Sequence, residues 1–92
     1  MILSACATVE IPDREYVLAK AAFDAAVATE AVKFAPQFYY KAEKSYKKAE
    51  QLYKDRYYEE AKQEFITARA LAERAETAAR VKQFNSTGGV NE

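Results

Sequence analysis

The sequence predicts an all-α protein, a three-helix antiparallel bundle. Only two glycines and two prolines occur among 92 residues, and both prolines suit the first turn of a helix. Alanines and aromatic residues recur in steps of three and four, which places each set on one face of a helix. These stripes continue on both sides of a short break within residues 53–61. We therefore expect helices to fill most of residues 13–84, with a tight hairpin between the second and the third.

Length and composition restrict the classes of function. A chain of 92 residues can bury one modest core, and it is too short for a deep active-site cleft together with a scaffold. Lysine plus arginine equals aspartate plus glutamate at 14 each, so no overall field favours nucleic acid as a partner. Histidine is absent and cysteine occurs once, which removes most zinc sites, a histidine general base and an internal disulfide.

Catalysis finds little support in the remaining side chains. Glu60 and Glu64 lie on adjacent turns, but a di-iron site of the helical-bundle type also needs histidines from two helices. The serines have no recognisable base partner. We expect no enzymatic activity, no metal and no cofactor.

Residues 1–12 are expected to form a lipobox-like N-terminus and a tether. Leu3-Ser4-Ala5-Cys6 resembles a bacterial lipobox, in which small side chains precede the cysteine that receives the lipid. The resemblance implies that Cys6 becomes an acylated N-terminus with enough chains for stable anchoring. The residue after it, Ala7, is not the aspartate associated with inner-membrane retention, so the resemblance implies the outer membrane.

Two features of this segment leave alternatives open. A basic n-region and a full apolar h-region do not precede Cys6, so we expect that the chain is trimmed or that its native start lies upstream. The alternative is a lone cysteine in a frayed terminus. No segment approaches the roughly 20 apolar residues of a membrane span.

The first helix is expected from about Pro12 or Asp13 to Lys33 or Phe34. One face, which should cover the hairpin, carries Tyr16, Phe23, Val27 and Phe34. The opposite face carries small and aliphatic side chains that either reflect the high helix propensity of alanine or form a contact surface. Its candidate contact residues are Leu18, Ala21, Ala25 and Val32.

The second helix should begin at Pro36 and end near Asp55, and the third should run from about Tyr57 to Phe84, with its last turns overhanging. Residues 85–92 have the composition of a flexible tail. Lysines on the second helix form either a solvated face or a contact with an anionic surface. Beside them, Tyr39 and Tyr40 are expected to be exposed, and together with Tyr58 they form a candidate contact patch.

The hairpin resembles a tetratricopeptide helix pair. Tyr58-Glu59-Glu60-Ala61 follows the break, Phe65 comes four residues after Ala61, and Ala68 three after that. Arg56 stands near the turn, where the tetratricopeptide pattern has glycine, and no second copy of the pattern is visible, although such arrays need about three repeats. The first helix must then cover the exposed faces of the pair.

From Cys6 to about Lys82 the chain is similar to a family of small bacterial envelope lipoproteins that is known only as a domain of unknown function. The resemblance implies a helical domain in the periplasm and assigns no catalytic residue. We therefore expect a lipid-anchored module that binds other envelope proteins and is attached to the membrane through Cys6. The alternative is a structural subunit that self-assembles through its first helix into a homo-oligomer or filament.

Overall fold

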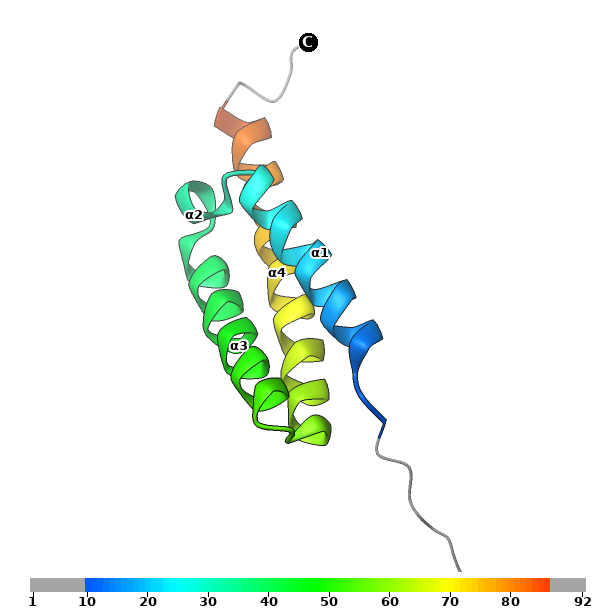
Figure 1. The fold of residues 1–92 in the computed structure, drawn as a ribbon. Helices are drawn as coiled ribbons and strands as arrows, with labels where there is room; N and C mark the ends of the chain where they lie inside the picture. Colours follow the sequence, from blue (N-terminus) through cyan, green and yellow to red (C-terminus); the bar gives the residue numbers. More distant parts are fainter. Residues whose placement is uncertain (1–9, 87–92) are drawn as a thin grey trace, which may run out of the picture.

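The protein, described here by a computed structural model for residues 10–86, is all-α (Figure 1). Its helices are α1 (Asp13–Ala28), α2 (Ala31–Phe34), α3 (Pro36–Lys54) and α4 (Tyr58–Ser86). The all-α class is confirmed, and the described residues contain no strand. The expected count of three helices is wrong, because the segment predicted as one first helix is divided into α1 and the short α2. Cys6 and the rest of the proposed lipobox lie outside the described residues.

The division falls at Thr29 and Glu30. Glu30 adopts a left-handed backbone conformation with φ of 59°, and its amide donates to the carbonyl of Val27 at 3.0 Å. The Thr29 hydroxyl donates to the Ala26 carbonyl at 3.0 Å, so one of the last carbonyls of α1 is satisfied by a side chain. Across the bundle, the side-chain amide of Gln83 donates to the Thr29 carbonyl at 2.6 Å. These bonds offset the roughly 1–2 kcal/mol cost of a left-handed conformation without glycine.

The turn between α3 and α4 is a Schellman motif. The amide of Arg56 donates to the Tyr53 carbonyl at 3.1 Å, and the amide of Tyr57 donates to the Leu52 carbonyl at 2.9 Å. Arg56 has φ of 67°, the conformation that glycine usually supplies at this position. The tight hairpin predicted between the second and third long helices is therefore present, and the helix after it begins at Tyr58, one residue later than expected.

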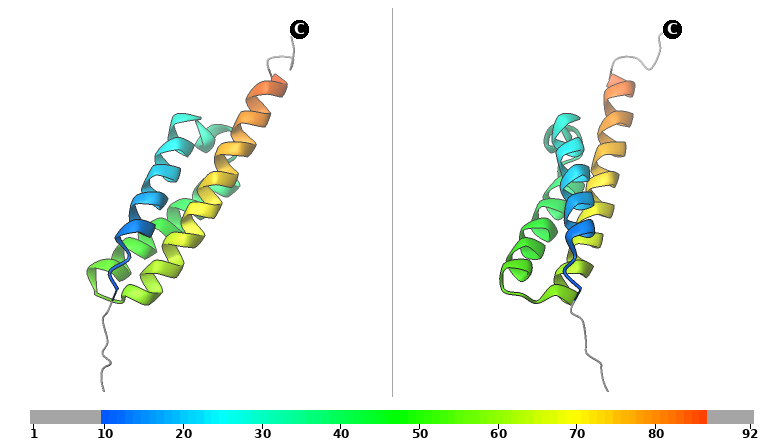
Figure 2. Two further views of the ribbon diagram at one scale, coloured as in Figure 1. Left: turned by 90° about the vertical axis from the view of Figure 1, so that its right-hand side faces the viewer. Right: turned by 45° about the vertical axis from the view of Figure 1, so that its right-hand side comes forward.

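Helix α4 is the element on which the others pack, and α1 and α3 lie side by side along it (Figures 1 and 2). Its 29 residues span about 43 Å, and its C-terminal turns extend past the ends of α1 and α3 (Figure 2). One stripe of α4 is fully or almost fully buried and consists of Ala61, Phe65, Ala68, Ala72, Ala75 and Ala79. These residues recur at steps of three and four, as the sequence predicts.

The core has two regions of different composition. In the first, called the aromatic end, Phe65 and four buried alanines are covered by Tyr16, Tyr46, Leu52 and Tyr53. In the second, the alanine end, every buried core residue is alanine, from Ala26 in α1 to Ala79 in α4. Phe65 is the only large side chain among residues 10–86 that is fully buried.

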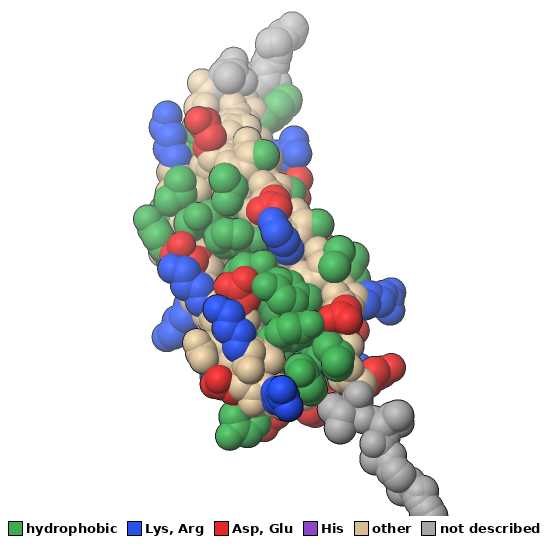
Figure 3. Space-filling model, in the orientation of Figure 1, with side chains coloured by type: hydrophobic (Ala, Val, Ile, Leu, Met, Phe, Trp, Pro, Cys, Tyr) green, Lys and Arg blue, Asp and Glu red, His purple; other side chains and the backbone are tan. Residues whose placement is uncertain are grey.

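A row of aromatic rings fills the seam between α1 and α3. Phe23 stacks on Tyr46 with the ring centroids 5.4 Å apart, and Tyr16 stacks on Phe65 at 4.6 Å. Figure 3 shows hydrophobic side chains gathered along this seam. Edge-to-face contacts continue the row, so the rings hold the two helices together. The row runs in order through Tyr40, Tyr39, Phe23, Tyr46, Tyr16, Tyr53 and Tyr58.

The predicted inner face of the first helix is correct in part. Tyr16 and Phe23 pack against the two core regions as expected, whereas Val27 is 50% exposed. Val27 lies in the last turn of α1, where the chain leaves the helix and redirects at Glu30. Phe34, placed on the same face by the sequence pattern, belongs to α2 and lies half-buried beside the alanine end.

Candidate interaction surfaces

Hydroxyl groups of the seam are bonded to carboxylates across the helices. Tyr16 donates to Glu50 at 2.9 Å, and Tyr53 donates to Asp13 at 2.6 Å. The bond to Asp13, followed by burial, raises the pKa of Tyr53 to about 12. The bond to Glu50 raises the pKa of Tyr16 above its ordinary value, with burial contributing next. These phenols therefore stay protonated at pH values at which a free tyrosine ionises.

Tyr46 and Tyr39 belong to the same row of rings, where both stack on Phe23. Burial, followed by the negative charge of Glu50, raises the pKa of Tyr46 to about 12. Burial also raises the pKa of Tyr39, with Glu43 contributing next. A neutral phenol beside a carboxylate acts as a hydrogen-bond donor and not as a nucleophile, so the seam is explained by its structural role.

The predicted contact face of the first helix does not form one surface. Ala21 is exposed in α1, but Leu18 and Ala25 are half-buried. Val32 is 45% exposed and lies in α2, beyond the left-handed turn at Glu30, so it does not continue the face of α1. The alignment of Leu18 with Val32 assumed an unbroken helix, and the turn removes it.

The three tyrosines predicted as a patch are likewise separated. Tyr40 is 56% exposed, as expected, but Tyr39 is half-buried because its ring stacks on Phe23 at 5.4 Å. Tyr58 is half-buried against Tyr53 at 5.7 Å. Between Tyr40 and the end of α3 the helix rises about 21 Å, so Tyr58 lies far from Tyr40. Near the hairpin the exposed tyrosine is Tyr57, whose exposed fraction equals that of Tyr40, and not the predicted Tyr58.

The lysines of α3 are partly paired. Lys47 lies 3.8 Å from Glu43 on the same helix, and Lys48 lies 3.4 Å from Glu64 on α4. Lys41 and Lys44 border a shallow hollow of about 330 Å³ with Lys48. All these ammonium groups are exposed, so each ion pair contributes little to stability.

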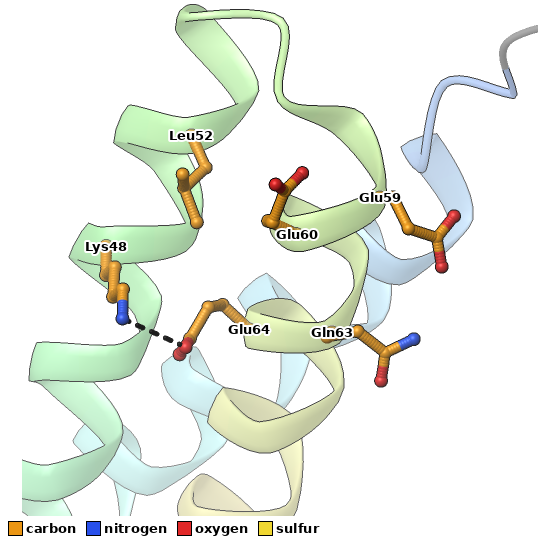
Figure 4. Close-up of a pocket in the computed structure, with 6 residues that line it drawn as sticks. All are labelled: Lys48, Leu52, Glu59, Glu60, Gln63 and Glu64. Carbon is orange, nitrogen blue, oxygen red and sulfur yellow. Dashed lines mark ion pairs between the residues drawn. The ribbon is translucent and has the colours of Figure 1, made fainter.

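Figure 4 shows a second hollow, of about 280 Å³, between the end of α3 and the start of α4. In the figure, Glu64 reaches toward Lys48, whereas Glu59 and Gln63 point away from α3. Glu59 and Glu60 lie in the first turn of α4, where the helix dipole stabilises negative charge. Within residues 10–86, no group of three potential ligands is placed to hold a metal ion. The acidic character of this hollow is therefore explained by helix stability.

A third surface was not identified from the sequence. Two adjoining hollows, of about 370 Å³ and about 540 Å³, share Phe38 and Ala78 and form one surface, which we call the phenylalanine trough. It lies where the start of α3 meets the later part of α4, at the end of the bundle away from residue 10 (Figure 1). The residues that define it are Phe34, Phe38, Ala70, Arg74, Ala78 and Lys82.

Cations lie over both phenylalanine rings of the trough. The Arg74 guanidinium lies 5.6 Å from the centroid of Phe38, and the Lys33 ammonium lies 5.2 Å from that of Phe34. The sequence pattern placed Phe34 on the inner face of the first helix. Both rings are only partly buried. The buried residues that they contact are alanines, whose methyl groups are too small to cover a ring. A hint in the sequence was the lack of large aliphatic residues on α4 opposite Phe34 and Phe38, where Ala75, Ala78 and Ala79 leave little to cover the rings.

The chain belongs to a family described as a domain of unknown function (DUF4398), which matches residues 14–85. The match covers α1 to α4 almost completely and confirms that the chain belongs to a domain-of-unknown-function family, while the lipoprotein assignment and the tetratricopeptide-like hairpin stay predictions. No curated protein and no solved structure matches the chain significantly. None of the helices in residues 10–86 is both long enough and apolar enough to cross a membrane.

Proposed function

We propose that the protein is a non-catalytic, lipid-anchored interaction module of the bacterial cell envelope that faces the periplasm from the outer membrane. The observation that supports binding best is the phenylalanine trough, in which two rings are only partly covered by the chain's own core. Apolar surface that remains open in a folded domain is a common mark of a contact site.

In this proposal the anchor and the trough act together, because the trough lies toward the end of the bundle away from residue 10. Helix α1 has 16 residues and rises about 24 Å between the end nearest residue 10 and the end nearest α2. A lipid on Cys6 would hold the first of these ends at the membrane, and the trough would then face away from it. This arrangement favours a protein partner over the anchoring membrane itself.

The anchor is tested by intact-mass spectrometry of the protein isolated from its native cells. We expect Cys6 to be the N-terminal residue and to carry acyl chains, and Cys6→Ser to release the protein from the membrane fraction. An unmodified Cys6 within a longer chain would contradict the anchor. Photo-crosslinking from Tyr40 in native cells tests binding, and capture of lipid alone would contradict a protein partner.

We also propose that α3 and α4 pair in the manner of a tetratricopeptide hairpin. Support comes from Arg56, whose positive φ supplies the turn conformation for which that pattern uses glycine. A single pair of this kind needs cover, and α1 packs on α4 beside α3 (Figure 2).

Self-assembly through α1 is the second candidate. It is favoured by the outer side of α1, where Val17 is 66% exposed and Ala21 is also exposed. Ala21→Glu places a charge there without disturbing the core. If identical copies associate through α1, the mass in solution falls to that of one chain in this variant, and an unchanged monomeric mass for both proteins contradicts self-assembly.

A further inference from the structure

The phenylalanine trough carries a net positive charge. Arg74 and Lys82 line it, and Lys33 lies over the ring of Phe34 at its edge. Within residues 10–86 none of these three cations is within ion-pair distance of a carboxylate, whereas Arg69 and Arg80 on the same helix are paired with Glu73 and Glu76. Glu73 is the acidic residue that lines the trough, and its charge is already engaged by Arg69 at 3.0 Å.

The start of α3 adds two hydrogen-bond donors to the same surface. Ala35 is the N-cap residue and provides no side-chain hydrogen bond, and Pro36 has no amide hydrogen. The amides of Gln37 and Phe38 belong to the first turn, whose N–H groups have no acceptor within the helix, and both residues line the trough. The positive end of the α3 dipole lies at the same place.

The dimensions of the trough suit a helix more than a single ion. From Ala70 to Lys82 it follows α4 for about 18 Å, which equals about three turns of helix. Small side chains, including Ala70, Thr77 and Ala78, line it along α4, so a second backbone can approach closely. Phe38 provides an apolar contact where the two hollows meet, Phe34 provides another in the smaller hollow, and Arg74 and Lys82 add positive charge.

We propose that the trough binds an acidic amphipathic helix of a partner protein, whose apolar side chains pack on Phe34 and Phe38 and whose carboxylates pair with Arg74 and Lys82. Helix-in-groove recognition of this kind uses apolar anchors on one helix face and charges beside them. The inference rests on the proposed binding function but does not depend on the lipid anchor.

The experiment uses a fluorescent synthetic helical peptide of roughly 14 residues with leucines on one face and glutamates beside them. The fluorescence anisotropy of this peptide is measured as the full-length protein is added. The same titration is made with a control peptide in which lysines replace the glutamates. We expect the acidic peptide to bind and the basic peptide to bind at least about tenfold more weakly. Arg74→Glu should weaken binding of the acidic peptide about tenfold and strengthen binding of the basic one.

Two control variants, Arg14→Glu and Val17→Ala, separate the trough from general effects. Arg14→Glu makes the same charge change in the first turn of α1 and should leave binding unchanged. Phe38→Ala should weaken binding about tenfold, whereas Val17→Ala should not. Phe38 packs against the alanine core, so circular dichroism must show that the variant is folded; Arg74 is exposed and provides the test that is independent of folding.

Equal affinity for the two peptides, or no effect of Arg74→Glu, would overturn the inference. Association only with vesicles that contain an anionic phospholipid would assign the trough to a lipid surface and overturn it as well. A protein mass in solution of two chains, reduced to one chain by Phe38→Ala, would assign the trough to a second copy of this chain and overturn the inference. Failure of the peptide while crosslinking from Tyr40 still captures a protein would reject this surface and leave the proposed function in place.

Discussion

The aromatic end and the alanine end of the bundle share α1, α3 and α4, but their side chains pack in different ways. At the aromatic end, Phe65 is fully buried and Tyr16, Tyr46 and Tyr53 surround it. At the alanine end the backbones meet through methyl groups, and the larger side chains lie at the margin. A fully buried ring removes far more apolar area from water than a methyl group, and Phe65 is the only such ring among residues 10–86, so the largest single hydrophobic contribution belongs to the aromatic end. The alanine end is left with partly open rings that can contact a partner.

The largest expected effect comes from removing the central ring. Phe65→Ala should destabilise the protein by about 3–5 kcal/mol, because the surrounding tyrosines cannot fill the cavity. Urea unfolding followed by circular dichroism measures the change. Ile66→Ala, at the neighbouring position where the side chain is 46% exposed, should stay within about 0.5 kcal/mol. Similar losses for the two variants would show that Phe65 is not the centre of the core.

A smaller effect is expected from crowding the alanine end. Ala75 has no exposed surface, so Ala75→Leu should cost about 1–3 kcal/mol by forcing α4 away from its neighbours. Ala70→Leu, at an exposed position of the same helix, provides the control and should be nearly neutral. A stabilised Ala75→Leu protein would mean that the alanine end contains unfilled space.

The hydroxyl bond between α1 and α3 should contribute less again. Tyr53→Phe removes the donor to Asp13 while keeping the ring, and we expect a small loss of stability, less than that of Ala75→Leu, because the bond is exposed to solvent. Combining it with Asp13→Asn in a double-mutant cycle isolates the coupling between the two side chains. Tyr40→Phe, at an exposed tyrosine, is the control. Additive effects of the two substitutions would show that the bond does not stabilise the fold.

High pH should weaken the aromatic end first. The folded pKa values of Tyr46 and Tyr53 are about 12, above the ordinary value of 10.0, so the folded protein keeps protons that the unfolded chain releases. Their contribution is complete below pH 10 and is lost as the pH rises toward about 12. Unfolding by urea at increasing pH, with tyrosinate absorbance recorded in parallel, should show stability falling in this window. Ionisation of all tyrosines near pH 10 in the folded protein would contradict the raised pKa values.

The helices of this molecule are readable from the sequence because alanine and aromatic residues repeat at the helical period. The turn at Arg56 is also readable, since the stripes on either side of it must face each other. The turn at Glu30 could not be predicted from the sequence. The left-handed conformation of this glutamate is supported by the hydrogen bonds that the side chains of Thr29 and Gln83 donate, and these bonds form only in the folded chain. That turn displaced Val32 from the predicted contact face.

The predicted sites were less accurate than the predicted helices. Tyr39 was expected at the surface, but the spacing of one helix cannot show that Phe23 of another stacks on it. The phenylalanine trough combines residues of α2, α3 and α4, and its open rings follow from the small volume of the alanines beside them. Burial of Phe38 therefore depends on a neighbour's size, which a pattern along one helix does not contain.

Native-state amide hydrogen exchange along α4 tests most directly the claim that the aromatic end holds the fold together. Amides near Phe65 and Ala68 should exchange only through global unfolding, while amides near Ala75 and Ala79 should exchange faster through local opening of the alanine end. If the amides near Ala75 and Ala79 exchange as slowly as those near Phe65, or more slowly, the division into a stabilising end and a binding end is contradicted.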